Sequence, residues 1–331
     1  MITPLLSVVI PTHQRPKFLA RSIASVLSTT SLHDVEVVVV PNGSSDEWRT
    51  VAVQYERDSR VRWLPLPIGN ACVARNHGLA NAQGTYVRFL DDDDYLLKAA
   101  ADQLELIEQT HADICSAPLA NVTSDGSIQY SLGLPATNDF AAAAILPTGI
   151  SLTQGSIFRR VCTTDVKWRE NAVLYDDYFW MLDLAASREM AWLQTPEPVA
   201  AYVQHDGKRL SRVRRTATNS RLLVEALLNL HTHLSSTARL TPERTTATAR
   251  ALLTHAHSAF PASPVFLGSV IGQALALDPT ASPTQPIFQK YPFLARNIVA
   301  AELAMLVPRY LTRGYRRALW SMGGMLSRLK P

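Results

Sequence analysis

The chain has 331 residues, of which 47% are hydrophobic and 18% are charged. This composition is typical of a globular protein with a substantial core and excludes an intrinsically disordered chain. The formal net charge of +4 is small for this length, so composition does not indicate a nucleic-acid-binding protein.

Hydrophobic runs and helical patterns alternate through the first hundred residues. Short β-branched runs ended by turn residues predict buried strands over residues 6–11, 35–40, 61–66 and 85–90. Apolar residues at helical spacing predict helices over residues 16–28, 46–58 and 70–84, the last capped by Gly84. Strands that alternate with helices favour an α/β fold with a mostly parallel sheet flanked by helices.

The pattern changes twice along the rest of the chain. From about residue 113 to 211, shorter strands and loops are mixed with some helix. Beyond about residue 215 the chain is mainly helical, with periodic stretches at 219–234 and 242–260. A proline-rich segment, 261–286, is expected to separate these from a last helical stretch, and a domain boundary is predicted near residue 215.

Four consecutive aspartates, Asp91 to Asp94, follow the fourth predicted strand directly. Parallel sheets of this kind bind their ligands at the carboxyl ends of the strands. Carboxylates there can hold a hard cation such as Mg²⁺, which would neutralise a diphosphate leaving group. The alternative is a solvated acidic turn, or a cap on the next helix with Asp94 near its start.

Four segments together resemble a known family, and they cover residues 6–28, 35–46, 69–95 and 174–185. They are similar to the inverting glycosyltransferases of family two, which have the GT-A fold and include bacterial surface-polysaccharide enzymes. The resemblance implies a Rossmann-like GT-A catalytic domain at 1–215 and a helical C-terminal region at 216–331. Within the catalytic domain it implies a nucleotide-sugar-binding half at 1–95 and an acceptor-binding half at 96–215.

The resemblance also implies a donor site. Pro11 and Thr12 would line the nucleotide pocket, and Asn42 would meet the base. Many family members carry two aspartates where this chain has Pro41 and Asn42. Asn42 keeps an acceptor oxygen, although a plain Asn-Gly turn explains it equally well. Arg75 would contact the base or diphosphate, or else lie on a helix surface.

The same resemblance implies metal ligands. Asp93 would bind the cation, Mn²⁺ or Mg²⁺, while Asp91 or Asp92 would bond the ribose or the donor sugar. The fourth acid leaves this assignment ambiguous by one residue. His205 falls where many members carry a late histidine near the diphosphate, so it would ligate metal or bond phosphate, unless it is structural.

A second acidic pair, Asp176 and Asp177, precedes an aromatic helix. The resemblance makes one of the two the general base that deprotonates the acceptor hydroxyl. Aligning Trp180 with the aromatic residue of the family favours Asp176, whereas the usual Glu-Asp form favours Asp177. The other residue would cap the helix.

Basic residues gather in two later segments. The first follows His205 and is either a solvated loop or a lid over an anionic donor or lipid diphosphate. The second is the C-terminal tail, where basic residues alternate with aromatic and aliphatic ones and no acid occurs after Glu302. That pattern is typical of a peripheral membrane segment, or of a helix that packs on the enzyme or a second subunit. The basic residues are Lys208, Arg209, Arg212, Arg214 and Arg215, then Arg309, Arg313, Arg316, Arg317, Arg328 and Lys330.

Cysteine use and the N-terminus bear on location. Cys72, Cys115 and Cys162 are far apart and odd in number, which indicates reduced thiols in a cytoplasmic protein. Neither a signal peptide nor a transmembrane helix is predicted. The expected location is the cytoplasm, with contact to the inner face of the membrane as an option through the tail.

The predicted activity is that of a hexosyltransferase-type enzyme, EC 2.4. It would move a sugar from a UDP-, TDP- or GDP-linked donor to a hydroxyl of a glycan or lipid-linked acceptor, inverting the anomeric centre. Two alternatives stay open: a nucleotidyltransferase that makes an activated sugar, and a non-catalytic protein that binds nucleotide sugars. Nucleic acid is not expected as a partner, and the oligomeric state is open.

Overall fold

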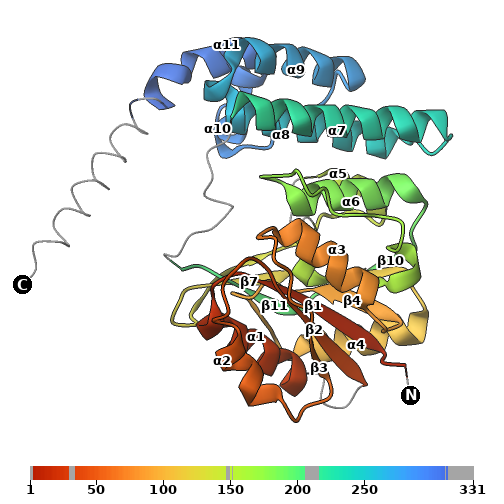
Figure 1. The fold of residues 1–331 in the computed structure, drawn as a ribbon. Helices are drawn as coiled ribbons and strands as arrows, with labels where there is room; N and C mark the ends of the chain where they lie inside the picture. Colours follow the sequence, from red (N-terminus) through yellow and green to blue (C-terminus); the bar gives the residue numbers. More distant parts are fainter. Residues whose placement is uncertain are drawn as a thin grey trace, which may run out of the picture. The chain divides into compact units, whose positions relative to one another are not determined.

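The computed structural model describes residues 3–29, 34–146, 150, 152–205, 216–309 and 311. The chain divides into two compact units, Met1–Val213 and Arg214–Pro331. The first is a mixed α/β unit (Figure 1), and the described residues of the second form helices and turns without strands.

A seven-stranded sheet forms the centre of the first unit, in the order β10-β6-β9-β4-β1-β2-β3 (Figure 1). Every pair between neighbours is parallel except the two that involve β9. The predicted mostly parallel α/β sheet is therefore confirmed. Its strands are β1 Leu6–Thr12, β2 Val35–Pro41, β3 Val61–Trp63, β4 Tyr86–Phe89, β6 Ile114–Ser116, β9 Ser156–Arg159 and β10 Trp192–Gln194.

Helices cover both faces of this sheet (Figure 1). On one face, α1 and α4 pack their apolar residues against Val8 and Ile10 of β1. On the other face, α3 lies over Val9, and Trp180 of α6 contacts the ring of Phe89 at 5.3 Å between centroids. The strands are buried on both sides, which explains their continuous apolar runs. The helices are α1 Pro16–Thr29, α2 Arg49–Ala52, α3 Ala71–Asn81, α4 Ala99–Thr110, α5 Phe140–Ile145 and α6 Asp176–Ser187.

A second, four-stranded sheet has the order β5-β11-β7-β8. Strand β5 follows the aspartate run directly, and it pairs in antiparallel fashion with β11. This pairing brings the chain after β11 back to the carboxyl end of β4, although the two are more than a hundred residues apart in sequence. The strands are β5 Tyr95–Leu96, β7 Leu119–Val122, β8 Ile128–Leu132 and β11 Ala200–Val203.

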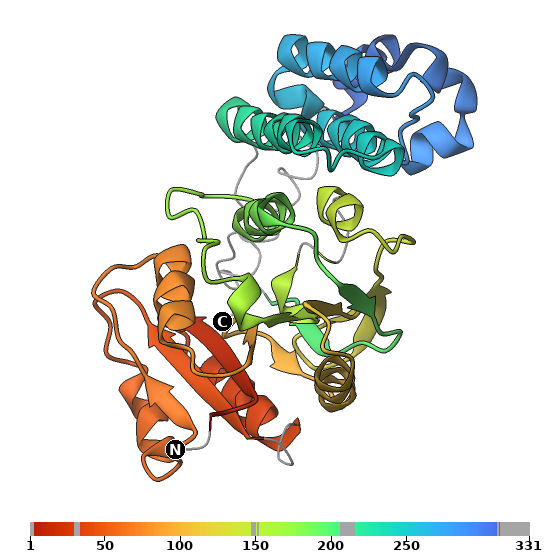
Figure 2. The same cartoon turned by 90° about the vertical axis from the view of Figure 1, so that its right-hand side faces the viewer.

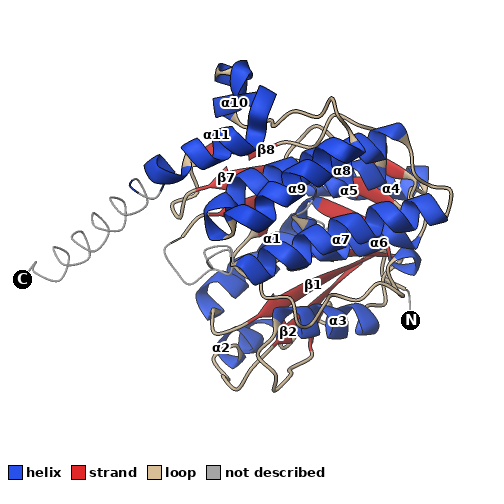
Figure 3. Cartoon of the chain, turned by 90° about the horizontal axis from the view of Figure 1, so that it is seen from above, coloured by secondary structure: helices blue, strands red, loops and turns tan. Residues whose placement is uncertain are grey.

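The second unit is built from helices (Figures 2 and 3). Thr216 and Thr241 cap α7 and α8 by accepting backbone N–H groups with their hydroxyls. The prediction that the segment 261–286 separates helices is wrong, because α9 lies inside it. Pro264 starts that helix, since proline is tolerated in the first turn. The helices are α7 Ala217–Ser236, α8 Pro242–Ala259, α9 Pro264–Leu277, α10 Pro286–Lys290 and α11 Ile298–Ala304.

Two local predictions in the first unit also need correction. The helix predicted over 46–58 is reduced to α2 and a 3₁₀ turn at Val53–Tyr55. The helix predicted to close at Gly84 ends at Asn81 with Ala82 as its cap. Gly84 has another role, because a Cβ atom there would lie 2.6 Å from the backbone nitrogen of Ser7.

Within the described residues, none of the helices combines the length and the apolar character needed to cross a membrane. The basic loop at 208–215 and the tail at 312–331 lie outside the described residues.

Candidate active site

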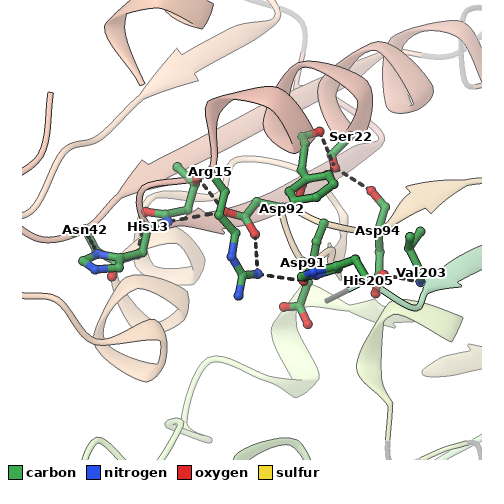
Figure 4. A network of polar contacts seen from close by, with 12 residues as sticks. His13, Arg15, Ser22, Asn42, Asp91, Asp92, Asp94, Val203 and His205 are labelled. Carbon is green, nitrogen blue, oxygen red and sulfur yellow. Dashed lines mark hydrogen bonds and ion pairs between the residues drawn. The ribbon is translucent and has the colours of Figure 1, made fainter. Parts of the chain in front are cut away.

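The four aspartates after β4 have different partners, and Figure 4 labels three of them, Asp91, Asp92 and Asp94. They lie at the carboxyl ends of β1 and β4, where the chain leaves the sheet. Successive side chains in a turn face different directions, so adjacent carboxylates need not share one environment. Each of the four is therefore described by its own contacts.

Asp94 is a structural residue. Its side chain is fully buried, and its two oxygens accept from the Val203 backbone nitrogen and from Gln154 Nε2, both at 2.9 Å. Lys98 stands at the N-cap position of helix α4, which has no side-chain cap, so Asp94 does not cap it. The residue ties the end of β4 to β11.

Asp92 faces the end of β1. Its Oδ2 accepts from Thr12 Oγ1 at 2.7 Å and from the His13 backbone nitrogen at 3.3 Å. Its Oδ1 accepts from Arg15 Nη1 at 3.2 Å. Burial raises the pKa of Asp92 to about 7 against the opposing effect of the Arg15 charge. This carboxylate holds the β1–α1 loop to the aspartate run.

Asp93 meets His205. The Nε2 atom of His205 lies 2.8 Å from Asp93 Oδ2, and Arg15 Nη1 donates to the same oxygen at 2.7 Å. Both side chains are buried, and the His205 ring lies 4.9 Å from the Phe18 ring. The two predicted metal ligands are therefore neighbours in space.

Arg75 connects the aspartate run to the second acidic pair. Its Nη2 donates to Asp91 Oδ1 at 2.7 Å, and its Nη1 donates to Asp176 Oδ2 at 2.9 Å. The guanidinium is buried and lies 4.5 Å from the centre of the Trp168 ring. One rigid side chain thus fixes two carboxylates that are 85 residues apart in sequence (176 − 91).

Asp177 is in a different setting from Asp176. Its Oδ1 accepts from Thr153 Oγ1 at 3.3 Å. Burial, and then the negative charge of Asp176, raise the pKa of Asp177 well above its ordinary value of 3.8. Helix α6 is preceded by Tyr175 in a left-handed conformation and has no side-chain cap, so neither acid caps it.

The predicted base pocket lies at the ends of β1 and β2. Asn42 is buried, and its Nδ2 donates to the Thr12 carbonyl at 2.9 Å. A small pocket beside it is lined by Thr12, Gln14, Arg15, Pro16, Pro41, Asn42, Ser45 and Trp48. Pro11 is buried in β1 opposite Val40, and neither Pro11 nor Arg75 lines this pocket.

Several side chains at the site escape prediction from the sequence. Arg15 follows the first strand and faces the aspartates, so a basic residue beside an acidic rim could have indicated it. Thr153, Gln154 and Trp168 lie in irregular segments without a periodic signal. Their role depends on contacts made after the chain folds.

The aspartate run fits a hard divalent cation. Asp91, Asp93 and Asp94 carry oxygens that lie within 4.8 Å of one another. Both oxygens of Asp94 already accept hydrogen bonds from protein groups. Asp91 and Asp93 are therefore the acidic candidates for metal ligands, and His205 lies beside Asp93. Carboxylates suit Mn²⁺ and Mg²⁺ when substrate phosphates complete the shell.

A mostly parallel sheet flanked by helices, with aspartates at the carboxyl ends of its strands, is a fold of the GT-A type. Residues 7–157 match Glycosyl transferase family 2, and this part of the chain is a domain of that family.

Curated relatives are glycosyltransferases of bacteria. The chain is 36% identical over 124 residues to the uncharacterized glycosyltransferase EpsJ of Bacillus subtilis, covering 37% of this chain and 36% of that protein. It is 27% identical over 187 residues to the GalNAc(5)-diNAcBac-PP-undecaprenol beta-1,3-glucosyltransferase of Campylobacter jejuni, covering 54% and 59%. The chain therefore spans less than two thirds of the length of these relatives.

Among solved structures, the chain resembles S. aureus TarS 1-349 in complex with UDP-GlcNAc, with a TM-score of 0.64 and 19% identity. The match covers 95% of this chain and 92% of the TarS chain. At this identity the likeness establishes the fold.

Proposed function

We propose that the protein is an inverting glycosyltransferase that moves a sugar from a nucleoside-diphosphate donor to an acceptor hydroxyl. The observation that carries the proposal is the bridge made by Arg75 between Asp91 and Asp176. The guanidinium group of Arg75 bonds Asp91 on the donor side and Asp176 on the acceptor side, so the two groups of acids lie close together. A sugar bound against the aspartate run would therefore lie beside the acidic pair.

Asp93 and His205 would hold the cation, and Asp91 would bond the ribose or the sugar. The cation, Mn²⁺ or Mg²⁺, supplies positive charge that neutralises the diphosphate as it leaves. Trp48 and Asn42 border the pocket proposed for the base. Binding of UDP-GlcNAc by TarS, which shares the fold, supports a UDP-sugar as the donor.

Asp177 is the better candidate for the general base. Asp176 is held by Arg75, whereas the raised pKa of Asp177 brings it towards the range in which a base works best. Asp177 would take the proton of the acceptor hydroxyl while that oxygen forms a bond to the anomeric carbon. The bond from that carbon to the donor phosphate oxygen breaks in the same step, and the configuration inverts. Asp176 would position Arg75.

The acceptor is proposed to be a glycan or a lipid-linked glycan of the bacterial surface. An undecaprenol-linked acceptor in the name of the Campylobacter jejuni relative supports this class. The basic tail beyond Leu311 would bind anionic lipid at the cytoplasmic face of the membrane, where each basic residue contributes about 1 kcal/mol. Arg309 is already paired with Glu302 at 2.8 Å.

Product analysis tests the proposal. The protein is incubated with UDP-sugars, Mn²⁺ and bacterial glycolipid extract, and the released nucleotide products are separated. Release of UDP that depends on acceptor is expected. Release of pyrophosphate in a parallel incubation with UTP and a sugar 1-phosphate would show a nucleotidyltransferase instead, and binding of UDP-sugar without turnover would favour a non-catalytic protein.

A further inference from the structure

A second pocket lies at the other edge of the main sheet from β3. It is an open pocket lined by the loop 135–138 and by strand β10, and its volume is about 600 Å³. Figure 1 shows β10 at the end of the sheet opposite β3. The residues assigned to donor binding and catalysis do not line it.

Strand register places this pocket relative to the acidic pair. Val87 of β4 pairs with Phe158, Phe158 with Ile114, and Ile114 with Trp192 of β10. Paired residues face the same side of a sheet, so Trp192 shares its face with Phe158. Phe158 contacts Trp180 of α6 at 4.9 Å between ring centres. Helix α6 begins with the acidic pair, so the pocket and the pair lie on one face of the sheet.

The separation suits an extended ligand. Three strand spacings of about 4.8 Å separate β10 from β4, which gives roughly 14 Å across the sheet. Strands β4 and β10 run in the same direction, because two antiparallel pairings with β9 lie between them. A ligand of a few sugar units is long enough to span this lateral distance.

The lining of the pocket indicates what it would bind. The indole of Trp192 is half-buried, and its Nε1 donates to Ser116 Oγ at 3.0 Å, which fixes the ring. The Gln194 side chain donates to the Thr137 carbonyl at 2.6 Å, and the side chain of Asn138 is exposed. Charged side chains do not occur among the lining residues. A phosphate-rich ligand needs cationic partners, which this surface does not offer.

A fixed aromatic ring beside amide groups matches a neutral pyranose. The ring supplies an apolar surface for the C–H face of the sugar, and amides donate to and accept from its hydroxyls. We infer that this pocket binds a neutral sugar unit of the acceptor glycan, away from the hydroxyl that reacts. The inference rests on the proposed transfer to a glycan. Binding at a remote unit would hold the acceptor for attack at the acidic pair.

Nuclear magnetic resonance of the full chain tests the inference without any donor. The indole N–H signal of Trp192 is assigned by its loss in Trp192→Phe. Cellotetraose, maltotetraose, laminaritetraose and chitotetraose are then titrated separately at millimolar concentrations. At least one of them is expected to shift the Trp192 signal. In the double variant Asn138→Ala, Gln194→Ala, affinity should fall about fivefold through loss of hydrogen bonds.

A control variant shows whether a shift of the Trp192 signal comes from binding in this pocket. Gln129→Ala changes an exposed amide on β8, outside the pocket, and should leave the titration unchanged. The titration contains no donor, so failure of the proposed transfer would not imitate failure of the pocket. The inference is overturned if none of the four tetrasaccharides moves the Trp192 signal. Equal affinity in the double variant would overturn it as well.

Discussion

Four adjacent carboxylates at the end of β4 differ in what they contact. Asp94 accepts hydrogen bonds from the Val203 nitrogen and from Gln154, and Asp92 accepts them from Thr12 and from the β1–α1 loop. Asp93 meets His205, and Asp91 meets Arg75. Concentrated negative charge is tolerated here because each acid has a donor or a cation of its own. The run thus combines two structural acids with two that face the proposed donor.

Asp94→Ala should destabilise the protein. It would leave the buried Val203 N–H and the Gln154 amide without their acceptor, at a cost of about 2–4 kcal/mol in the free energy of unfolding. Urea unfolding followed by circular dichroism measures it. Asp165→Asn, an exposed acid, is the control and should change stability by less than about 0.5 kcal/mol. An unchanged midpoint for Asp94→Ala would contradict the structural role.

Asp176→Asn and Asp177→Asn should differ in activity. Loss of the general base should lower kcat about 10³-fold in Asp177→Asn. Asp176→Asn should have a smaller effect, since it weakens the hold on Arg75 and leaves the base in place. UDP release under saturating donor measures both. A larger loss in Asp176→Asn would reverse the assignment, and little loss in either would mean that the base lies elsewhere.

The raised pKa of Asp177 predicts two pH effects. The base works when deprotonated, so kcat/KM should rise with pH through a pKa well above 3.8. The folded state binds the Asp177 proton more tightly than the unfolded state does. The protonated Asp177 therefore adds to the free energy of unfolding at pH below 3.8, and this contribution is lost as pH rises through the pKa of the folded state. Asp177→Asn should therefore unfold at higher urea than the wild type at neutral pH, but not at pH below 4. Equal urea midpoints of Asp177→Asn and the wild type at neutral pH would contradict the raised pKa. A pH profile of kcat/KM whose acidic limb has a pKa near 3.8 would contradict it as well.

At the scale of elements, the site depends on strands that meet at one rim. The runs that became β1, β2 and β4 could be predicted, because strands buried on both faces are apolar throughout. The pairing of β5 with β11 could not, because it joins segments about a hundred residues apart. The sequence therefore indicated the aspartate run, whereas the partners of Asp94 and the bridge by Arg75 required the folded chain.

Gly84→Ala tests the packing of α3 and β4 against β1. A Cβ atom there would lie 2.6 Å from the Ser7 nitrogen, and backbone cannot move aside easily. The expected loss of stability is about 1–3 kcal/mol. Gly133→Ala is the control, since nothing lies within 4 Å of a Cβ at that position. Thermal unfolding compares the two, and equal midpoints would show that Gly84 is not needed for close approach.

At the scale of the whole molecule, the family match covers residues 7–157, which includes most of the half proposed to bind the donor, 1–95, and part of the half proposed to bind the acceptor, 96–215. The second acidic pair and strand β10 lie beyond it, whereas the loop 135–138 that lines the second pocket lies within it. The family match therefore includes the aspartate run and does not reach the second acidic pair. The Pro-rich segment 261–286 shows that composition alone did not predict every helix, because α9 lies in it and begins with proline in its first turn.

The account depends most on a cation held at Asp93 and His205 against the donor diphosphate. Crystals grown with UDP and MnCl₂, measured at a wavelength where manganese scatters anomalously, test this directly. An anomalous peak is expected about 2.1 Å from a carboxylate oxygen of Asp93, beside the UDP phosphates. UDP bound at another place, or bound at this rim with manganese absent from Asp93, would contradict the account.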